Sequence, residues 1–447
     1  MDNQFEIRMN DFAAQALASA QQAGVSPAEV TVSSSESFSV RVRAQKLEDY
    51  KVSDRFHLVL RGMWQGKIGT ASTQAMDEES LALLIQGVKE SAELIETDEQ
   101  DEILPPDSHY ASVCNYSDAV SAVSPEEKIA LAMQIDKRLS GADERVKPDS
   151  ALVASTSETF ALKNTLGLDL THRSNMIYAY ASCLAKEDNA AATGFKLLWG
   201  YSMDDVRADA IADGCVSDAL DKLGAGKLSS GPRPVILRNN AMADLLSTFC
   251  GVFSADNAQK GMSLLAGKEG QIVASSTVSL MDDPLMPWGL GSCPFDREGA
   301  ATLTKCVIEN GMLKTLLHNR KTAKKAGIQT TGNAAGSGRV APSNFYIQPG
   351  SDSLDALLAK MQNGLLITEL SGLHAGANPI SGDFSLLARG FEVEDGKCTR
   401  AVEQFTAAGN FFDLLKNIMS VGSDLLFEGS PIGSPSVSVS SLNIAGE

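Results

Sequence analysis

Long apolar runs, local metal-binding motifs and paired cysteines are all missing from this 447-residue sequence. Nowhere do eighteen apolar residues follow one another, which argues against a membrane-spanning helix. The N-terminal stretch contains Asp2, Glu6 and Arg8 and no apolar run, so we expect no signal peptide. The seven cysteines are odd in number and form no CxxC pair, which indicates neither a disulfide framework nor a zinc knuckle. Free thiols suit a reducing compartment, and we expect a cytoplasmic protein.

Basic charge is also scarce. The 38 lysines and arginines are outnumbered by 56 aspartates and glutamates, which gives a formal net charge of −18. Binding to nucleic-acid phosphates requires a clustered basic surface. The densest basic cluster, between His318 and Lys325, is short, and we interpret it as the polar face of a helix. We therefore expect no nucleic-acid partner and no membrane partner, while attraction of basic peptides stays open.

Length and composition predict a globular protein of two or three domains, because 43% of the residues are hydrophobic and 21% are charged. An acidic stretch at 96–102 followed by two prolines resembles a linker, and the Gly- and Ser-rich stretch 224–232 is a second boundary. We predict an α+β fold with three units. These are an N-terminal α+β domain (1–104), a central α+β domain (105–226) and a β-rich C-terminal domain (232–447).

Helix caps and apolar periodicity predict the local elements. Asn10 is predicted to cap a helix that stops at Gly24, and residues 77–95 show helical spacing. Ser124 and Glu127 form a capping-box pattern around Pro125, which predicts another helix start. A further helix is expected at about 204–223 and a helical stretch over 242–253, and strands at 30–32, 38–42, 56–60, within 151–198 and at 235–237. Asn-Gly at 310–311 and Asp-Gly at 395–396 favour tight type I′ hairpins.

No local pattern supplies a hydrolytic metal. Zinc peptidases present two histidines from one helix with a glutamate beside them. The sequence has only five histidines, at 57, 109, 172, 318 and 374, so no local helix can present two of them. A site assembled from distant histidines stays open.

Other catalytic patterns are equally weak. No GxSxG elbow, phosphate-binding loop or dinucleotide fingerprint occurs. Cys293 with His374 is the one nucleophile pairing to name, although a small loop or core cysteine is the favoured interpretation. The carboxylate pairs Asp282–Asp283 and Glu126–Glu127 are interpreted as turn and helix-cap residues. No catalytic residue is assigned.

Two polar, glycine-rich stretches, 330–338 and 368–385, stand out. Glycine lets a backbone approach a ligand closely, and it serves plain tight turns equally well. His374 is more often a hydrogen-bonded structural histidine than a base. If these loops bind peptide, the candidate residues are Gly332, Asn333, His374, Asn378, Gly382 and Asp383.

The second stretch and its surroundings resemble a known family. Residues 365–370, 376–385 and 390–397 are similar to the PmbA/TldE branch of the TldD/PmbA peptidase family, as are 421–424 and 444–446. Segments 292–299 and 331–334 are similar to further family segments. The resemblance covers nearly the whole chain. It implies an α/β N-terminal half and a barrel-like C-terminal domain, assembled as a dimer around an internal cavity.

The same resemblance implies where zinc would bind in a catalytic relative. TldD-type chains carry HExxxH on the first helix of the C-terminal domain, with a cysteine near the C-terminus as the third ligand. The matching positions here are Leu246, Ser247 and Gly251, and no cysteine follows Cys398. Leu246 and Gly251 have no ligand atom, and Ser247 cannot replace the glutamate. The resemblance therefore implies no metal in this chain.

Three hypotheses follow. The first is a PmbA/TldE-type component of a metallopeptidase for cytoplasmic peptide maturation, in which a TldD-type partner supplies zinc and the substrate is a peptide or unfolded protein. The second is a non-catalytic peptide-binding or adaptor homodimer. The third is an independent hydrolase that uses Cys293. The family is also labelled a modulator of DNA gyrase, and the acidic charge suggests that any such effect is indirect.

Overall fold

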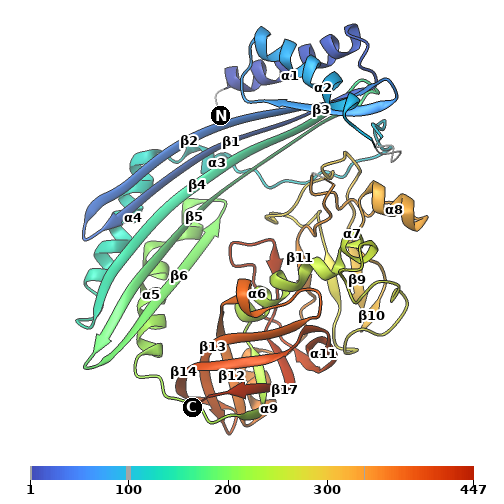
Figure 1. Ribbon diagram of the computed structural model, residues 1–447. Helices are drawn as coiled ribbons and strands as arrows, with labels where there is room; N and C mark the ends of the chain where they lie inside the picture. Colours follow the sequence, from blue (N-terminus) through green and yellow to red (C-terminus); the bar gives the residue numbers. More distant parts are fainter. Residues whose placement is uncertain (1–2, 97–101, 337, 447) are drawn as a thin grey trace.

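A long, curved antiparallel sheet arches over the rest of the molecule (Figure 1). The structure is a computed structural model that describes residues 3–96, 102–336 and 338–446. Apart from its two ends, the predicted acidic linker at 96–102 lies outside the described residues. The sheet has the order β3-β2-β1-β4-β5-β6. Its strands are β1 (Ala28–Arg43), β2 (Lys46–Trp64), β3 (Lys67–Thr73), β4 (Val146–Asn164), β5 (Asp169–Glu187) and β6 (Ala190–Gly200).

Pairing of β1 with β4 joins the first two predicted units into one sheet. Four helices cover a single face of it: α1 (Asn3–Gln22), α2 (Glu78–Glu93), α4 (Pro125–Ser140) and α5 (Ala208–Lys222). On β1, Val30 and Val32 pack in the core of α1 and α2, while Val40 and Val42 pack in the core of α4 and α5. These four valines are spaced by even numbers, so they share one face of the strand.

The helix predictions are confirmed at most boundaries. Asp77 caps α2 by accepting a hydrogen bond from the Ser80 N–H at 2.8 Å, and Ser124 and Glu127 form the capping box of α4. The predicted start of the first helix at Asn10 is wrong, because α1 already begins at Asn3. Met9 is buried and Phe5 packs against the same core, so tertiary contacts extend the helix beyond the local cap signal. The helix expected at 204–223 is a short 3₁₀ turn, η1 (Met203–Val206), followed by α5. A single turn, α3 (Asp118–Ala122), precedes α4.

The C-terminal half contains a closed barrel, as predicted. Its strands are β7 (Gly231–Leu237), β12 (Gly364–Ser371), β13 (Asp383–Glu394), β14 (Lys397–Asn410) and β17 (Val437–Ala445). The order β14-β13-β12-β7-β17 becomes a ring because β14 also pairs with β17. A further strand, β15 (Ile418–Val421), pairs antiparallel with β17. The chain is thus α+β with a barrel-like C-terminal part. Helices α6 (Asn239–Phe249), α9 (Leu354–Met361) and α11 (Phe411–Lys416) pack around the barrel, and Phe249 stacks on Phe411 at 4.6 Å.

A second, smaller sheet lies beside the barrel in the order β10-β9-β8-β11-β16. Its strands are β8 (Leu280–Asp282), β9 (Lys305–Glu309), β10 (Met312–Leu313), β11 (Phe345–Ile347) and β16 (Ile432–Gly433). Both predicted hairpins are confirmed, with positive φ at Asn310 and Gly311 and at Asp395 and Gly396. They belong to different sheets.

Short helices complete this half: η2 (Cys250–Phe253), α7 (Ala255–Gln259), α8 (Arg320–Ala326) and α10 (Leu373–Gly376). The predicted basic helix face is correct only in part. His318 precedes α8 and is buried, so it belongs to the core side and not to the polar face. None of the helices in the described part of the chain is both long and apolar enough to cross a membrane.

Candidate functional site

The family resemblance matches the zinc motif of catalytic relatives to Leu246 and Ser247 on α6 and to Gly251 just beyond it. Leu246 is fully buried in the core of the C-terminal half, while the neighbouring Ser247 is exposed. Gly251 lies beyond the helix in η2, and its carbonyl accepts a hydrogen bond from Asn257 Nδ2 at 2.8 Å. The three positions therefore face different surroundings. Within the described ranges, no three His, Cys, Asp or Glu side chains are grouped so that they could hold a metal ion. Leu246 and Gly251 have no side-chain ligand atom, so these positions do not fit a zinc ion.

One carboxyl group on α6 has an unusual protonation equilibrium. Asp244 lies close to Glu369 of β12 and to Glu428, and Thr248 Oγ1 donates to its backbone carbonyl at 2.9 Å. Desolvation by the surrounding protein, and then repulsion from Glu428 and Glu369, raise the pKa of Asp244 to about 6. The pKa of Asp244 therefore lies closer to neutral pH than that of an ordinary aspartate.

The first glycine-rich loop is held by a buried polar network. Lys305 Nζ donates to Asp282 Oδ2 at 2.8 Å and to Asn333 Oδ1 at 3.1 Å. Asn333 Nδ2 in turn donates to Asp282 Oδ2 at 2.7 Å. Asn333 is 3% exposed and Asp282 is fully buried. The interpretation of Asp282 as a turn residue is wrong, because it ends strand β8 and pairs with a lysine from β9. Asp283, the next residue, starts the loop and its Oδ1 accepts from the Leu285 N–H.

A second buried carboxylate connects this loop to the segment around 296. Asp296 Oδ1 accepts from the N–H groups of Glu298 and Ala300, and Asp296 Oδ2 accepts from the Ala334 N–H at 3.0 Å. Burial raises the pKa of Asp296, while these three backbone donors lower it. Gly332 has a φ of +69°, and a Cβ there would lie 3.0 Å from the Ala301 carbonyl. Gly332 and Asn333 are thus enclosed by neighbouring loops.

The second loop folds as a compact turn at the end of the barrel. Asn378 Oδ1 accepts from the Ile380 N–H at 3.0 Å, and the Gly382 N–H donates to the Asn378 carbonyl at 2.8 Å. Asn410 Nδ2 donates to Asp383 Oδ1 at 2.9 Å, and this hydrogen bond lowers the pKa of Asp383. Asn378 and Asp383 are exposed, as is His374 on α10, which packs beside α6.

The two groups of predicted peptide contacts occupy separate places. Gly332 and Asn333 lie against residues 282–305 and 341, whereas Gly382 and Asp383 lie against Asn410 and Phe412. The hydrogen bonds of the described residues give the two loops no common partner. Of the six candidates, His374, Asn378 and Asp383 present exposed side chains.

Cys293 is positioned as a packing residue. Its side chain packs in a cluster with Phe160, Leu162 and Phe295. Burial raises the pKa of the Cys293 thiol to about 11. A thiol that stays protonated at neutral pH is a poor nucleophile. This geometry gives no support to a Cys293 hydrolase.

Comparison with known proteins gives agreement along almost the whole chain. Residues 28–92, 99–223 and 230–446 match the first, central and C-terminal domains of the PmbA/TldA metallopeptidases. The Metalloprotease PmbA of Escherichia coli O157:H7 is 28% identical over 430 residues, which cover 94% of this chain and 92% of that relative. The Metalloprotease PmbA homolog of Haemophilus influenzae is 27% identical over 91% of this chain and 89% of its own length.

This chain belongs to the PmbA/TldD metallopeptidase family.

Solved structures agree with that assignment. A Thermotoga maritima protein described as a proposed modulator of a DNA gyrase is 33% identical, with a TM-score of 0.91 over 98% of this chain and 100% of that chain. The TldE structure from Thermococcus kodakarensis has a TM-score of 0.88 over 97% of this chain and 100% of its own, and its 22% identity makes it evidence for the fold alone.

One family segment has a structural task that the sequence did not reveal. Phe295 of the 292–299 segment stacks on Phe160 of β4 at 5.8 Å, and the Arg297 guanidinium lies over the same Phe160 ring at 3.8 Å. The segment 103–117 runs alongside, where Tyr110 Oη donates to the Gly299 carbonyl and Asn115 Nδ2 donates to the Ser292 carbonyl at 3.1 Å. These contacts, which we call the aromatic clasp, connect the large sheet to the C-terminal half. The resemblance marked the segment, but its partner on β4 is far away in the sequence.

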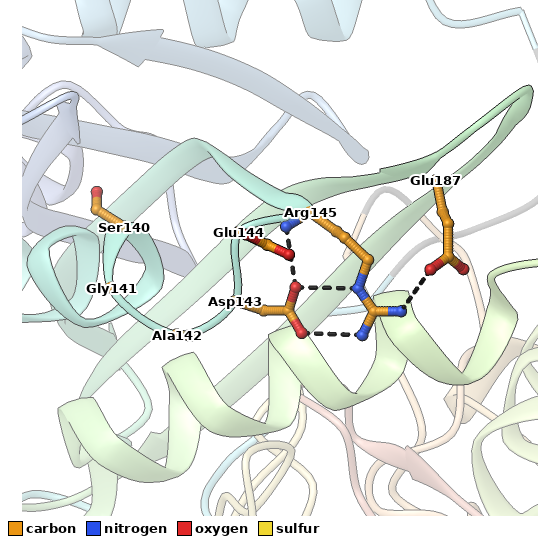
Figure 2. Close-up of a pocket in the computed structure, with 7 residues that line it drawn as sticks. All are labelled: Ser140, Gly141, Ala142, Asp143, Glu144, Arg145 and Glu187. Atoms are coloured by element: carbon orange, nitrogen blue, oxygen red, sulfur yellow. Dashed lines mark hydrogen bonds and ion pairs between the residues drawn. The ribbon is translucent and has the colours of Figure 1, made fainter.

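A shallow surface depression lies at the turn between α4 and β4 (Figure 2). Figure 2 shows Arg145 between two carboxylates: its Nη2 pairs with Asp143 at 2.9 Å and its Nη1 with Glu187 at 3.2 Å. The hydrogen bonds from Arg145 lower the pKa of Asp143 to about 2, and the same contacts raise the pKa of Arg145. The Arg145 guanidinium of this depression is thus already engaged by Asp143 and Glu187.

Proposed function

We propose that this chain is a PmbA/TldE-type component of a metallopeptidase that processes peptides in the cytoplasm, and that a TldD-type partner supplies the zinc. Membership of a metallopeptidase family supports peptide hydrolysis as the reaction to which this chain contributes. The observation that carries the subunit role is the environment of α6, where Leu246 is locked in the core and Gly251 offers only a backbone carbonyl already bonded to Asn257.

The division of labour follows from this chemistry. Hydrolysis of a peptide bond by zinc requires imidazole or carboxylate ligands around a metal-bound water. α6 offers an aliphatic side chain and a hydroxyl at the corresponding positions, so the chain holds and shapes the substrate while the partner activates water. His374, Asn378 and Asp383 are the exposed peptide contacts in this proposal, and Gly332 and Asn333 shape a separate loop.

The decisive experiment compares the chain alone with the chain mixed with an HExxxH-bearing relative from the same cell. We expect the chain alone to contain far less than one equivalent of zinc by elemental mass spectrometry and to leave an unfolded protein such as denatured casein intact. The mixture should cleave it. Replacing the glutamate of the partner's HExxxH by glutamine should abolish cleavage without preventing co-purification.

Two results would contradict the proposal. Stoichiometric zinc together with cleavage by the chain alone would show that it is a complete peptidase. Failure to co-purify with an HExxxH-bearing chain, together with no gain of activity in the mixture, would favour an adaptor homodimer.

A further inference from the structure

Arg41 of the large sheet has no carboxylate ion-pair partner within the described residues, although three other arginines of its strands have one. On the strands of this sheet, Arg43, Arg61 and Arg173 each form an ion pair, with Asp149, Glu29 and Glu6 respectively. Arg41 forms none within the described part of the chain, and its Nε is shielded from solvent without a hydrogen-bond partner. Its one hydrogen bond runs from Nη2 to Tyr180 Oη at 3.5 Å, which is long and therefore weak.

The neighbouring acid compensates this charge only in part, because Arg41 attracts the Asp49 carboxylate but forms no ion pair with it within the described residues. Asp49 lies directly opposite Arg41 in the β1–β2 pairing. Its carboxylate is bound instead by Lys51 Nζ at 2.7 Å, which is the main reason that the pKa of Asp49 is lowered. A half-buried guanidinium with free donors is costly unless an anion binds it.

The surroundings of Arg41 are apolar and aromatic. The strand register places Arg41, Leu152, Tyr180 and Leu197 in one row across β1, β4, β5 and β6. The Tyr180 ring packs against the Phe195 ring at 5.4 Å, and Phe195 is 50% exposed. We call Arg41, Tyr180, Phe195 and Leu197 the Arg41 surface.

This surface lies on the sheet face turned toward the C-terminal half. Leu152 and Phe160 alternate onto the same face of β4, and Phe160 is the residue that stacks on Phe295. At the β6 end, Leu197 lies next to Gly429, and Trp199 Nε1 donates to the Phe427 carbonyl at 2.8 Å. Figure 1 shows the large sheet arching over the C-terminal half.

We propose that the Arg41 surface binds the C-terminal carboxylate of a substrate peptide, with an apolar terminal side chain against Phe195 and Leu197. A guanidinium binds a carboxylate through two parallel hydrogen bonds, and the terminal Nη groups of Arg41 are engaged only by the long bond from Nη2 to Tyr180 within the described residues. The net charge of −18 disfavours peptides rich in acidic side chains, whereas one terminal carboxylate beside an apolar side chain matches a single arginine set among aromatic rings. This inference rests on the proposed function, because it assumes that a peptide is the substrate.

The test measures peptide binding by the full-length chain alone, without the partner. The probe is a fluorescent, unstructured peptide that ends in phenylalanine, prepared with a free carboxylate and as the C-terminal amide, and the dissociation constant comes from fluorescence anisotropy. We expect the free acid to bind at least about tenfold more tightly, since charge-assisted hydrogen bonds exceed neutral ones in strength. Arg41→Gln should remove this preference, and Arg41→Lys should retain part of it because the charge remains while the planar fork is lost.

Matched variants separate the site from general charge effects. Arg43→Gln alters an arginine two residues away on the same strand, already paired with Asp149 and exposed, and should leave the preference intact. Phe195→Ala should weaken binding of a peptide ending in phenylalanine more than that of one ending in glycine. Equal binding of acid and amide, or an acid preference that survives Arg41→Gln, would overturn the proposal. So would equally tight binding of an amidated peptide that carries an internal aspartate.

The outcome is independent of the zinc and co-cleavage experiment. Loss of the acid preference while the mixture still cleaves casein would reject the Arg41 surface and leave the subunit role in place. Should Arg41→Gln fail to fold, as judged by its thermal unfolding, the comparison of acid with amide on the unaltered chain and on Arg41→Lys still decides the question.

Discussion

Asp282 and Lys305 form a buried ion pair of 2.8 Å at the centre of the small sheet, with side chains that are 0% and 6% exposed. The pair connects β8 to β9. It also holds Asn333, whose Nδ2 donates to Asp282 Oδ2, and Ser343, whose N–H donates to Asp282 Oδ1. Four separate segments thus depend on one carboxylate.

Breaking this pair is predicted to destabilise the protein strongly. Lys305→Met leaves an uncompensated buried carboxylate, and we expect a loss of about 3–5 kcal/mol in the free energy of unfolding. Urea denaturation followed by circular dichroism measures it. The matched control is Lys324→Met, which removes an exposed ion pair with Glu102 and should cost less than about 1 kcal/mol. Similar losses for the two variants would contradict a structural role for the buried pair.

Asp244 is predicted to make stability depend on pH. Its pKa of about 6 in the folded chain lies above the value of 3.8 for an ordinary aspartate, so folding takes up a proton. The stabilising contribution is complete below pH 3.8 and is lost as the pH rises through 6. Asp244→Asn, which mimics the protonated form, should therefore become progressively more stable than the unaltered chain between pH 4 and pH 7. Unfolding curves at several pH values test this, and a constant difference across the range would refute it.

The aromatic clasp is predicted to hold the two halves together. Phe295 is 2% exposed, and Phe295→Ala removes its stacking on Phe160, so we expect a loss of about 3–5 kcal/mol. Limited proteolysis should also cut the 103–117 segment faster, because Tyr110 and Phe295 pack edge to face at 6.4 Å. Phe195→Ala, at a half-exposed ring on the same face of the sheet, is the control and should leave both measurements nearly unchanged. Unaltered cleavage of 103–117 in Phe295→Ala would speak against the clasp.

Two glycines that both have a positive φ angle should respond differently to replacement by alanine. Gly327 caps α8 with a φ of +69° and has open space where a Cβ would lie. Gly382 has a φ of +83°, and a Cβ there would meet the Phe412 ring at 2.6 Å. We expect Gly327→Ala to cost about 1 kcal/mol from backbone strain alone and Gly382→Ala about 2–4 kcal/mol because a clash is added. Thermal melts compare the two, and equal shifts would show that Phe412 moves aside freely.

The sequence by itself determined the features that depend on neighbouring residues. Ser124 and Glu127 satisfy one another's backbone groups within a single helical turn, so the capping box is legible without any tertiary contact. The same holds for Asn310–Gly311 and Asp395–Gly396, whose positive φ values follow from residue type. Absence of histidine at 246 and 251 is likewise a property of the sequence alone, and the family resemblance rested on contiguous segments.

Only the tertiary structure decided which polar residues are committed and which are free. Asn333 and Asp282 are 51 residues apart, and Lys305 is 23 residues from Asp282, so no local pattern could reveal that a glycine-rich loop and an acidic pair share one buried network. The start of α1 moved from Asn10 to Asn3 because Met9 is buried by packing that no cap signal encodes. Arg43 has an ion-pair partner and Arg41 has none within the described residues, and this difference arises from the residues that the neighbouring strands of the sheet supply. Burial and ion pairing are set by residues that folding brings together. The energy of an ion pair depends on the distance between its two charges in space, which their separation in the sequence does not give.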